Sequence, residues 1–247
     1  MIPKKIHYCW FGGKPLPEEA KKCINSWKKY CSDYEIIEWN ENNYDINKNK
    51  YTKYTYENKK FAFLTDYVRL DIIHNEGGIY LDTDVELVKS LDDLLNCDGY
   101  IGMEQTGTIN TGQGFGAIKN HPFIKENKEY YEEHDFWKTG EFKQVICVKI
   151  TTDILKKYGL KHENTFQKID MMNIYPVEYF CPLKMGTNKL IITNNTYSIH
   201  HFNASWYKGN KIIKKIKYYL IPLKQFIKKI INKQGEYYEN KSKKINS

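Results

Sequence analysis

Two aspartates separated by one residue, Asp82 and Asp84, follow directly on a short apolar run at residues 79–81. In an open α/β sheet, the carboxyl end of a strand is where ligands bind. Two carboxylates at this spacing can meet one hard divalent cation, and such a cation neutralises a diphosphate as it leaves. A pair of this kind also arises by chance about once in a chain of this length, and the competing interpretation is a solvated turn. The surrounding residues therefore decide whether the pair is a metal site.

An acid and a base lie upstream of this pair, on a helix that we expect over residues 58–75. Asp66 and Arg69 are three residues apart and therefore share one face of that helix. Arg69 is the only arginine among 38 basic residues, which indicates a need for the planar, five-donor guanidinium group. The pattern predicts a site for polar ligand groups. The alternative is an intrahelical ion pair, which contributes little at a surface.

Two adjacent histidines, His200 and His201, end a strand that we expect at residues 190–199. Neighbouring residues of a strand point to opposite faces, so only one of the two can serve a site. A neutral imidazole beside two carboxylates suits a cation such as Mn²⁺. The residue types leave the choice between the two histidines open.

Strands and helices alternate along the chain, which predicts an α/β fold with a mostly parallel sheet covered by helices on both faces. Gly77-Gly78 should end the long helix and lead into the strand before Asp82. The expected strands cover residues 5–10, 34–39, 79–81, 85–88, 100–104, 114–118, 173–175 and 190–199. The expected helices cover residues 18–30, 58–75, 90–95, 122–133 and 142–158, and residues 40–56 are expected to be irregular.

The composition narrows the class of protein. With 247 residues, 41% of them hydrophobic, the chain can build one α/β domain with a sizeable core. Its net charge of +8 comes from residues 208–233, which hold nine lysines and no acid, so the rest is close to neutral. A near-neutral body argues against nucleic acid as the partner and against a metal-dependent nuclease. Six cysteines without zinc spacing indicate a reducing environment, and we expect a cytoplasmic protein.

A tail at residues 208–247 is expected to form a separate domain beside a body at residues 1–207. Its isoleucines and leucines recur at three- and four-residue spacing, with lysines on the opposite face. This pattern predicts a basic amphipathic helix, which Pro222 should kink. Such a helix suits an anionic membrane surface. The alternative is a helix that packs on the body or on a partner helix.

Three separated segments resemble one known family. The run FAFLTDYVRLDIIHNEGGIYLDTDV, at residues 61–85, is similar to the DxD sugar-binding segment of glycosyltransferase family 32, which includes bacterial capsular polysaccharide transferases and yeast mannosyltransferases. The glucosylating domains of large clostridial toxins look similar there. IPKKIHYCWFGG near the N-terminus resembles the first strand of the family, and SIHHFNASW at residues 198–206 resembles its C-terminal motif.

The resemblance implies a GT-A type, Rossmann-like fold, a nucleoside-diphosphate-sugar donor, Mn²⁺ or Mg²⁺, and retention of the anomeric configuration. By position, Trp10 would stack on the donor base, and Asp66 and Arg69 would hold sugar hydroxyls. Asp82 would reach the ribose and the metal, and Asp84 would bind the metal directly.

Downstream, the resemblance favours His200 over His201 as the metal ligand. Ser205 and Trp206 would close over the diphosphate, although the toxins differ there, with an acid and a wider spacing. Asn110 precedes the strand at 114–118, where related folds use an asparagine to touch the transferred sugar; the alternative is a plain turn.

Together these features predict a retaining, metal-dependent glycosyltransferase at the cytoplasmic face of the membrane. It would move a hexose or an N-acetylhexosamine from a UDP-linked donor to an oligosaccharide acceptor, lipid-linked, in surface polysaccharide (capsule) synthesis. The alternatives are a host-directed protein glycosyltransferase and a non-catalytic nucleotide-sugar or glycan-binding module. The complete set of Asp82, Asp84 and His200 argues against the non-catalytic module.

Overall fold

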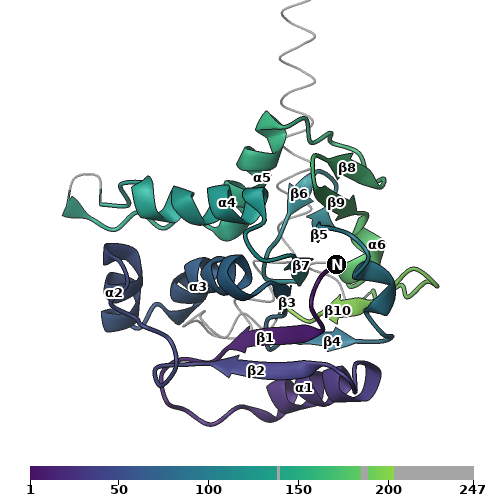
Figure 1. Cartoon of the computed structure of the whole chain (residues 1–247), viewed down its shortest axis with the longest axis horizontal. Helices are drawn as coiled ribbons and strands as arrows, with labels where there is room; N and C mark the ends of the chain where they lie inside the picture. Colours follow the sequence, from purple (N-terminus) through teal and green to yellow (C-terminus); the bar gives the residue numbers. More distant parts are fainter. Residues whose placement is uncertain (138–139, 185–188, 203–247) are drawn as a thin grey trace, which may run out of the picture. The chain divides into compact units, whose positions relative to one another are not determined.

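The computed structural model describes residues 1–137, 140–184 and 189–202 (Figure 1). The helices are α1 (Glu18–Tyr30), α2 (Lys50–Glu57), α3 (Phe61–Glu76), the 3₁₀ helix η1 (Asp92–Leu94), α4 (Pro122–Glu133), α5 (Cys147–Lys157) and α6 (Val177–Phe180). The strands are β1 (Lys5–Cys9), β2 (Glu35–Trp39), β3 (Gly78–Tyr80), β4 (Val85–Leu87), β5 (Gly99–Gln105), β6 (Thr108–Ile109), β7 (Phe115–Ala117), β8 (Gln167–Ile169), β9 (Met172–Tyr175) and β10 (Ser198–His200).

Some predicted features lie outside the described residues: Ser205, Trp206, the boundary after residue 207 and the tail at 208–247. Met1–Pro182 and residues 191–202 belong to one compact unit, which contains every site residue described below. The segment Leu183–Leu190 belongs to a second unit and pairs its two end residues in an antiparallel bridge. Within the described ranges, no helix is long and apolar enough to cross a membrane.

The main sheet has the strand order β2-β1-β3-β7-β5-β9-β8, with β6 paired to β5. β1 runs parallel to β2 and β3, and β5 runs parallel to β9. β7 lies antiparallel between β3 and β5, so β3 and β5 run in the same direction. Five strands therefore share one direction, namely β1, β2, β3, β5 and β9. The predicted α/β fold with a mostly parallel sheet is confirmed.

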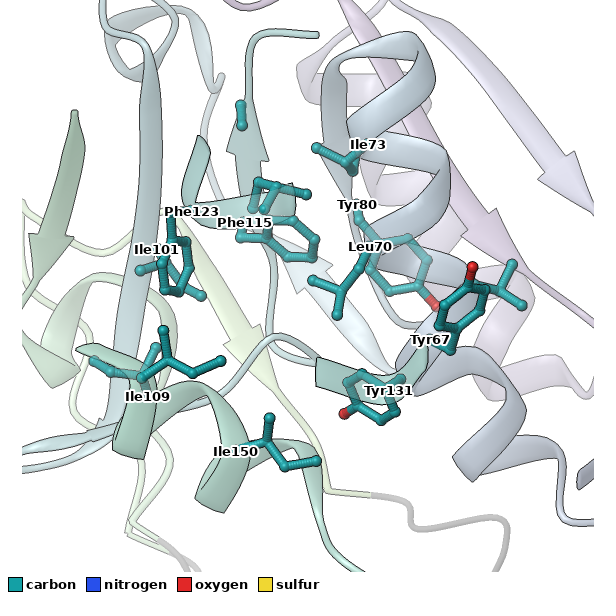
Figure 2. Packing of buried hydrophobic residues seen from close by; sticks show 14 of the residues in the cluster. Tyr67, Leu70, Ile73, Tyr80, Ile101, Ile109, Phe115, Phe123, Tyr131 and Ile150 are labelled. Carbon is teal, nitrogen blue, oxygen red and sulfur yellow. The ribbon is translucent and has the colours of Figure 1, made fainter. Parts of the chain in front are cut away.

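Alternating residues of the central strands build two hydrophobic clusters. Tyr80 and Ile101 belong to the cluster that also contains residues of α3, α4 and α5 (Figure 2). Ile79 and Leu81 belong to the other cluster, with Trp27 of α1 and residues of β4. The strand that leads to the predicted metal site is thus held on both faces.

Helix α3 brings the upstream pair of charged residues to this strand. It is buried along most of its length and packs against α2, α4, β1 and β3. It ends at Gly77, whose φ of 67° lets the chain turn back at once into β3. Gly78 also has a positive φ, and a methyl group there would lie 2.9 Å from the Lys5 carbonyl oxygen. Helix and strand are therefore neighbours in space as well as in sequence.

Three expectations about elements are wrong. The helix expected at 142–158 begins only at Cys147, and residues 142–146 are not helical. Residues 40–56 are not irregular throughout, because α2 begins at Lys50 behind a capping box between Asn49 and Thr52. The expected strand at 190–199 is a short one, Ser198–His200, that pairs with β4, and Ile191 and Ile192 before it are half exposed.

Candidate active site

Arg69 lies at the centre of a buried ionic cluster. Its Nη2 is 3.2 and 3.4 Å from the two Asp82 oxygens and 3.3 Å from Oδ1 of Asp66. Only 4% of the Arg69 side chain is exposed, against 28% for Asp82. The structure thus brings together three of the predicted residues, with the open edge of the cluster on the side of Asp82.

The rest of the guanidinium group is fixed by neighbouring side chains. Nε donates to the Thr65 carbonyl at 3.0 Å, and Nη2 is 3.3 Å from the Thr65 hydroxyl. Nη1 donates to the Thr111 hydroxyl at 3.2 Å, and the group lies 5.0 Å from the centre of the Tyr80 ring. Contacts in several directions need a planar fork, and the single ammonium of a lysine could not make them all.

Asp82 is oriented by three groups. In addition to Arg69, the Tyr80 hydroxyl donates to its Oδ1 at 2.9 Å, and its backbone N–H donates to the Gly112 carbonyl at 3.3 Å. Burial raises the pKa of Asp82, and the charge of Arg69 opposes that rise. The exposed 28% of the Asp82 side chain is where a ligand could reach its oxygens.

Asp66 faces the N-terminus of α5. Burial raises the pKa of Asp66 to about 6, while Arg69 and hydrogen bonds from the Cys147 thiol and backbone N–H lower it. Sγ of Cys147 is also 3.9 Å from Nη1 of Arg69 and 3.8 Å from Oδ1 of Asn110. Cys147 was not singled out from the sequence; no motif marks it, and only the fold brings α5 to α3.

Asn110 follows β6 and lies beside the same cluster. Its Oδ1 accepts the Gly112 backbone N–H at 2.6 Å, and the residue is 7% exposed. A methyl group at Gly112 would lie 2.5 Å from Oδ2 of Asp82 and 3.1 Å from both Arg69 and Asn110. The turn after β6 is therefore fitted closely against Arg69 and Asp82, and only glycine has room there.

Asp84 and His200 form a second pair, next to Asp82. The antiparallel pairing of β4 and β10 sets His200 opposite Val85, and Nε2 of His200 is 3.4 Å from Oδ1 of Asp84. Burial lowers the pKa of His200, but its hydrogen bond to Asp84 and nearby acids outweigh burial, so the pKa is raised. His201 points elsewhere, with Nε2 2.8 Å from Glu86.

This pair fits part of a divalent-cation site. Asp84 supplies a carboxylate and His200 an imidazole, both suited to Mn²⁺. Nδ1 of His200 is buried and has no hydrogen-bond partner among the described residues. Among the residues that the structure describes, no group of three or more metal-ligating side chains occurs. Asp82, the third predicted metal ligand, is hydrogen-bonded by Arg69 and Tyr80.

Trp10 is held by local contacts. Its indole N–H donates to the Lys14 carbonyl at 2.5 Å, and its backbone N–H donates to Trp39. A methyl group at Gly12 would lie 2.6 Å from the Phe61 ring, so this loop packs on the first turn of α3. The loop therefore reaches the helix that carries Arg69, although no described contact joins Trp10 to the ionic cluster.

Glu104 is a further acid that the sequence analysis did not single out. It is half-buried on β5, where the pairing with β6 shifts register between Met103 and Gln105. Burial raises the pKa of Glu104, and the charge of His200 lowers it. A bulge next to an antiparallel turn is a signal that a sequence alone does not show.

Several known proteins are similar to this chain in sequence or in fold. Residues 17–101 match the family described as glycosyltransferase sugar-binding region containing DXD motif. Inositol phosphoceramide mannosyltransferase 3 of Schizosaccharomyces pombe is 32% identical over 136 residues, which cover 50% of this chain and 35% of that protein. An uncharacterised glycosyltransferase of Acanthamoeba polyphaga mimivirus is 25% identical over 230 residues, 87% of each chain. The solved PaToxG glycosyltransferase has a TM-score of 0.48 and 19% identity, covering 63% of this chain and 69% of that one.

The chain thus spans about a third of the length of the fission-yeast relative, and most of the viral one. The matched region contains Asp66, Arg69, Asp82 and Asp84, the residues on which the site is built. Residues 17–101 of this chain are thus similar to the DXD-containing sugar-binding region of glycosyltransferases.

Proposed function

We propose that this chain is a glycosyltransferase that moves a hexose or an N-acetylhexosamine from a nucleoside diphosphate, with uridine as the expected base, to an acceptor sugar with retention of configuration. The observation that carries the proposal is the buried Arg69, which two carboxylates and the turn after β6 hold beside the DXD strand. A fixed set of donors and acceptors of this kind matches the hydroxyls of a sugar ring and discriminates against a ligand that lacks them.

Each residue then has a distinct part. Asp66 and Arg69 would bind hydroxyls of the transferred sugar, Asp82 would bind the ribose, and Nδ2 of Asn110 would face the sugar. Asp84 and His200 would hold Mn²⁺ or Mg²⁺, which supplies neutralisation of the charge on the leaving diphosphate. Trp10 would stack on the base, and Ser205 and Trp206, outside the described residues, would close over the diphosphate.

The names of relatives bear on the acceptor. Three similar fungal proteins are named for mannosyl transfer to an inositol phosphoceramide or for synthesis of its mannosyl product, which supports a hexose donor and a lipid-linked acceptor. We therefore propose a lipid-linked saccharide as the acceptor, in surface polysaccharide synthesis at the cytoplasmic membrane face. The alternative donor to a UDP-sugar is a mannose nucleotide such as GDP-mannose.

A donor screen tests the proposal directly. The full-length chain is incubated with UDP-glucose, UDP-galactose, UDP-N-acetylglucosamine or GDP-mannose and Mn²⁺, and release of UDP or GDP is measured. We expect release from at least one donor, loss of release in EDTA, and recovery with added Mn²⁺. Tight donor binding without release from any donor would instead favour a non-catalytic binding module.

The substitution Asp84→Ala tests whether Asp84 serves metal binding rather than the stability of the fold. Loss of one electrostatic stabiliser should lower release by about 10² to 10³-fold, with an unchanged Tm. Glu86→Ala is the matched control, since this acid on β4 is bound by His201 and should keep full release. Undiminished release in EDTA, or in Asp84→Ala, would overturn the metal's role.

A further inference from the structure

Glu104 is a carboxylate that the proposed roles leave unused. Among the described residues it has no hydrogen-bond or ion-pair partner, although it is half-buried. A half-buried acid without a partner is costly to keep and therefore suggests a ligand.

A β-bulge in β5 places Glu104 close in sequence to the hairpin that leads to Asn110. Met103 pairs with Ile109, but Gln105 pairs with Thr108, so Glu104 is the extra residue of a β-bulge. Bulges of this kind redirect a side chain and occur next to active sites. The same hairpin continues into Asn110, so the bulge and the sugar-binding turn are parts of one element.

The neighbours of Glu104 show which side of the site it faces. Helix α6 packs against both β5, which carries Glu104, and β10, which ends in His200, and the charges of Glu104 and His200 act on each other. His200 is the partner of Asp84, where the donor diphosphate is proposed to lie. Glu104 therefore borders the diphosphate side of the site, whereas Asp66 and Arg69 hold the sugar.

The stereochemistry of a retaining transfer indicates where the acceptor hydroxyl approaches the sugar. When the configuration is retained, the acceptor oxygen ends on the same face of the sugar that the diphosphate oxygen leaves. The acceptor hydroxyl must then arrive beside the diphosphate. We propose that Glu104 binds the acceptor hydroxyl, accepting its hydrogen bond and aiming its oxygen at the anomeric carbon; this inference rests on the proposed retaining transfer.

Two substitutions test this role without knowledge of the acceptor, because water takes the place of the acceptor hydroxyl during donor hydrolysis. In Glu104→Ala, the kcat for nucleotide release into water should fall about 100-fold, as expected for a misplaced nucleophile. Glu104→Gln keeps one hydrogen-bond acceptor oxygen and should recover part of the loss. The donor is whichever of the four sugar nucleotides the unaltered chain hydrolyses.

Binding measurements separate acceptor positioning from other roles. The Kd of the donor and the Kd of Mn²⁺, both by calorimetry, should stay within about twofold, and Glu86→Gln should match the unaltered chain throughout. Tm should not fall in either Glu104 variant, because no described partner is lost. Weaker binding of Mn²⁺ or donor in the Glu104 variants would place Glu104 in the donor site. An unchanged kcat would show that Glu104 has no role in the reaction. Either result would overturn the inference. Failure of the unaltered chain to hydrolyse any donor would overturn the proposed function itself.

Discussion

Arg69 joins groups from three parts of the chain through one side chain. It reaches Thr65 within α3, Asp82 after β3 and Thr111 after β6. Its pKa is raised well above the usual value, because the charges of Asp82 and Asp66 outweigh the burial that would lower it. The guanidinium group is thus a permanent cation that organises two acids.

The substitution Arg69→Lys should keep the positive charge but remove the planar guanidinium group and its several hydrogen-bond donors. We expect kcat/KM for the donor to fall by about 100-fold or more, since several directed donors are replaced by one ammonium. Tm should change little in comparison with the activity. Lys125→Arg, in a surface pair with Glu129, is the control for the reverse exchange and should behave as the unaltered chain. Full efficiency of Arg69→Lys would make Arg69 a structural ion-pair member.

The raised pKa of Asp66 makes a second prediction at this scale. The pKa of Asp66 in the folded chain is about 6, above its ordinary value of 3.8. Asp66 therefore binds a proton more readily in the folded chain than in the unfolded chain. Ionised Asp66 then costs stability above pH 6, and the cost disappears as the pH falls below about 4. Asp66→Asn should therefore raise Tm near pH 7.5, leave it unchanged near pH 4, and weaken donor binding at neutral pH. A Tm difference that does not vary with pH would contradict the buried-acid account.

Single residues were predictable where the sequence pattern is local. The spacing of Asp66 and Arg69 predicts a shared helix face, and the family resemblance of residues 61–85 added Asp82 to the same site. Cys147 and Glu104 were missed because their place depends on contacts across the fold. Asn110 was predictable in part. The sequence indicated the turn that contains it, but not the packing of that turn against Arg69.

At the scale of elements, the turn between β6 and β7 links Arg69, Asp82 and Asn110. The Gly112 N–H binds Asn110, its carbonyl accepts the Asp82 N–H, and the preceding Thr111 binds Arg69. The turn therefore sets the distance between the helix and the DXD strand. No space remains for a side chain at its tip.

Gly112→Ala should displace this turn. The added methyl group would overlap Oδ2 of Asp82 at 2.5 Å, and overpacking of this kind typically costs about 1–3 kcal/mol. We expect nucleotide release to fall about 100-fold, because a shift of about 1 Å at the site is enough for that loss. Gly159→Ala is the control: its φ of 94° imposes strain, but nothing lies within 4 Å of the added methyl group. It should lower Tm and keep the release rate, and equal release in both variants would contradict the proposed role of the turn.

Two amphipathic helices were predicted to the residue, whereas the start of α5 and the short strands were not. α1 and α4 have the bounds that their apolar spacing indicated. α2 was missed because its tyrosines and lysines hide the apolar face, although Asn49 marks its start. β7 is three residues long, and its antiparallel insertion between β3 and β5 follows from tertiary packing rather than from any pattern in those residues.

At the scale of the whole molecule, the positive charge is concentrated beyond the described residues. Nine lysines and no acid occur at residues 208–233, where isoleucines and leucines recur at helical spacing. A near-neutral catalytic unit with a basic, amphipathic segment favours a membrane surface over a nucleic acid. We propose that this tail holds the enzyme near a lipid-linked acceptor while the donor arrives from the cytosol.

Removal of the tail tests that proposal. Near an anionic leaflet each lysine can add about 1 kcal/mol, and this attraction falls off within a Debye length. The full-length chain should therefore sediment with phosphatidylserine-containing vesicles, less as salt rises, and hardly with pure phosphatidylcholine. A chain ending at Gly209 should lose this sedimentation and still release nucleotide from the donor. Equal sedimentation of both chains would rule out the tail as the anchor, and unfolding of the shortened chain would show that the tail packs on the body instead.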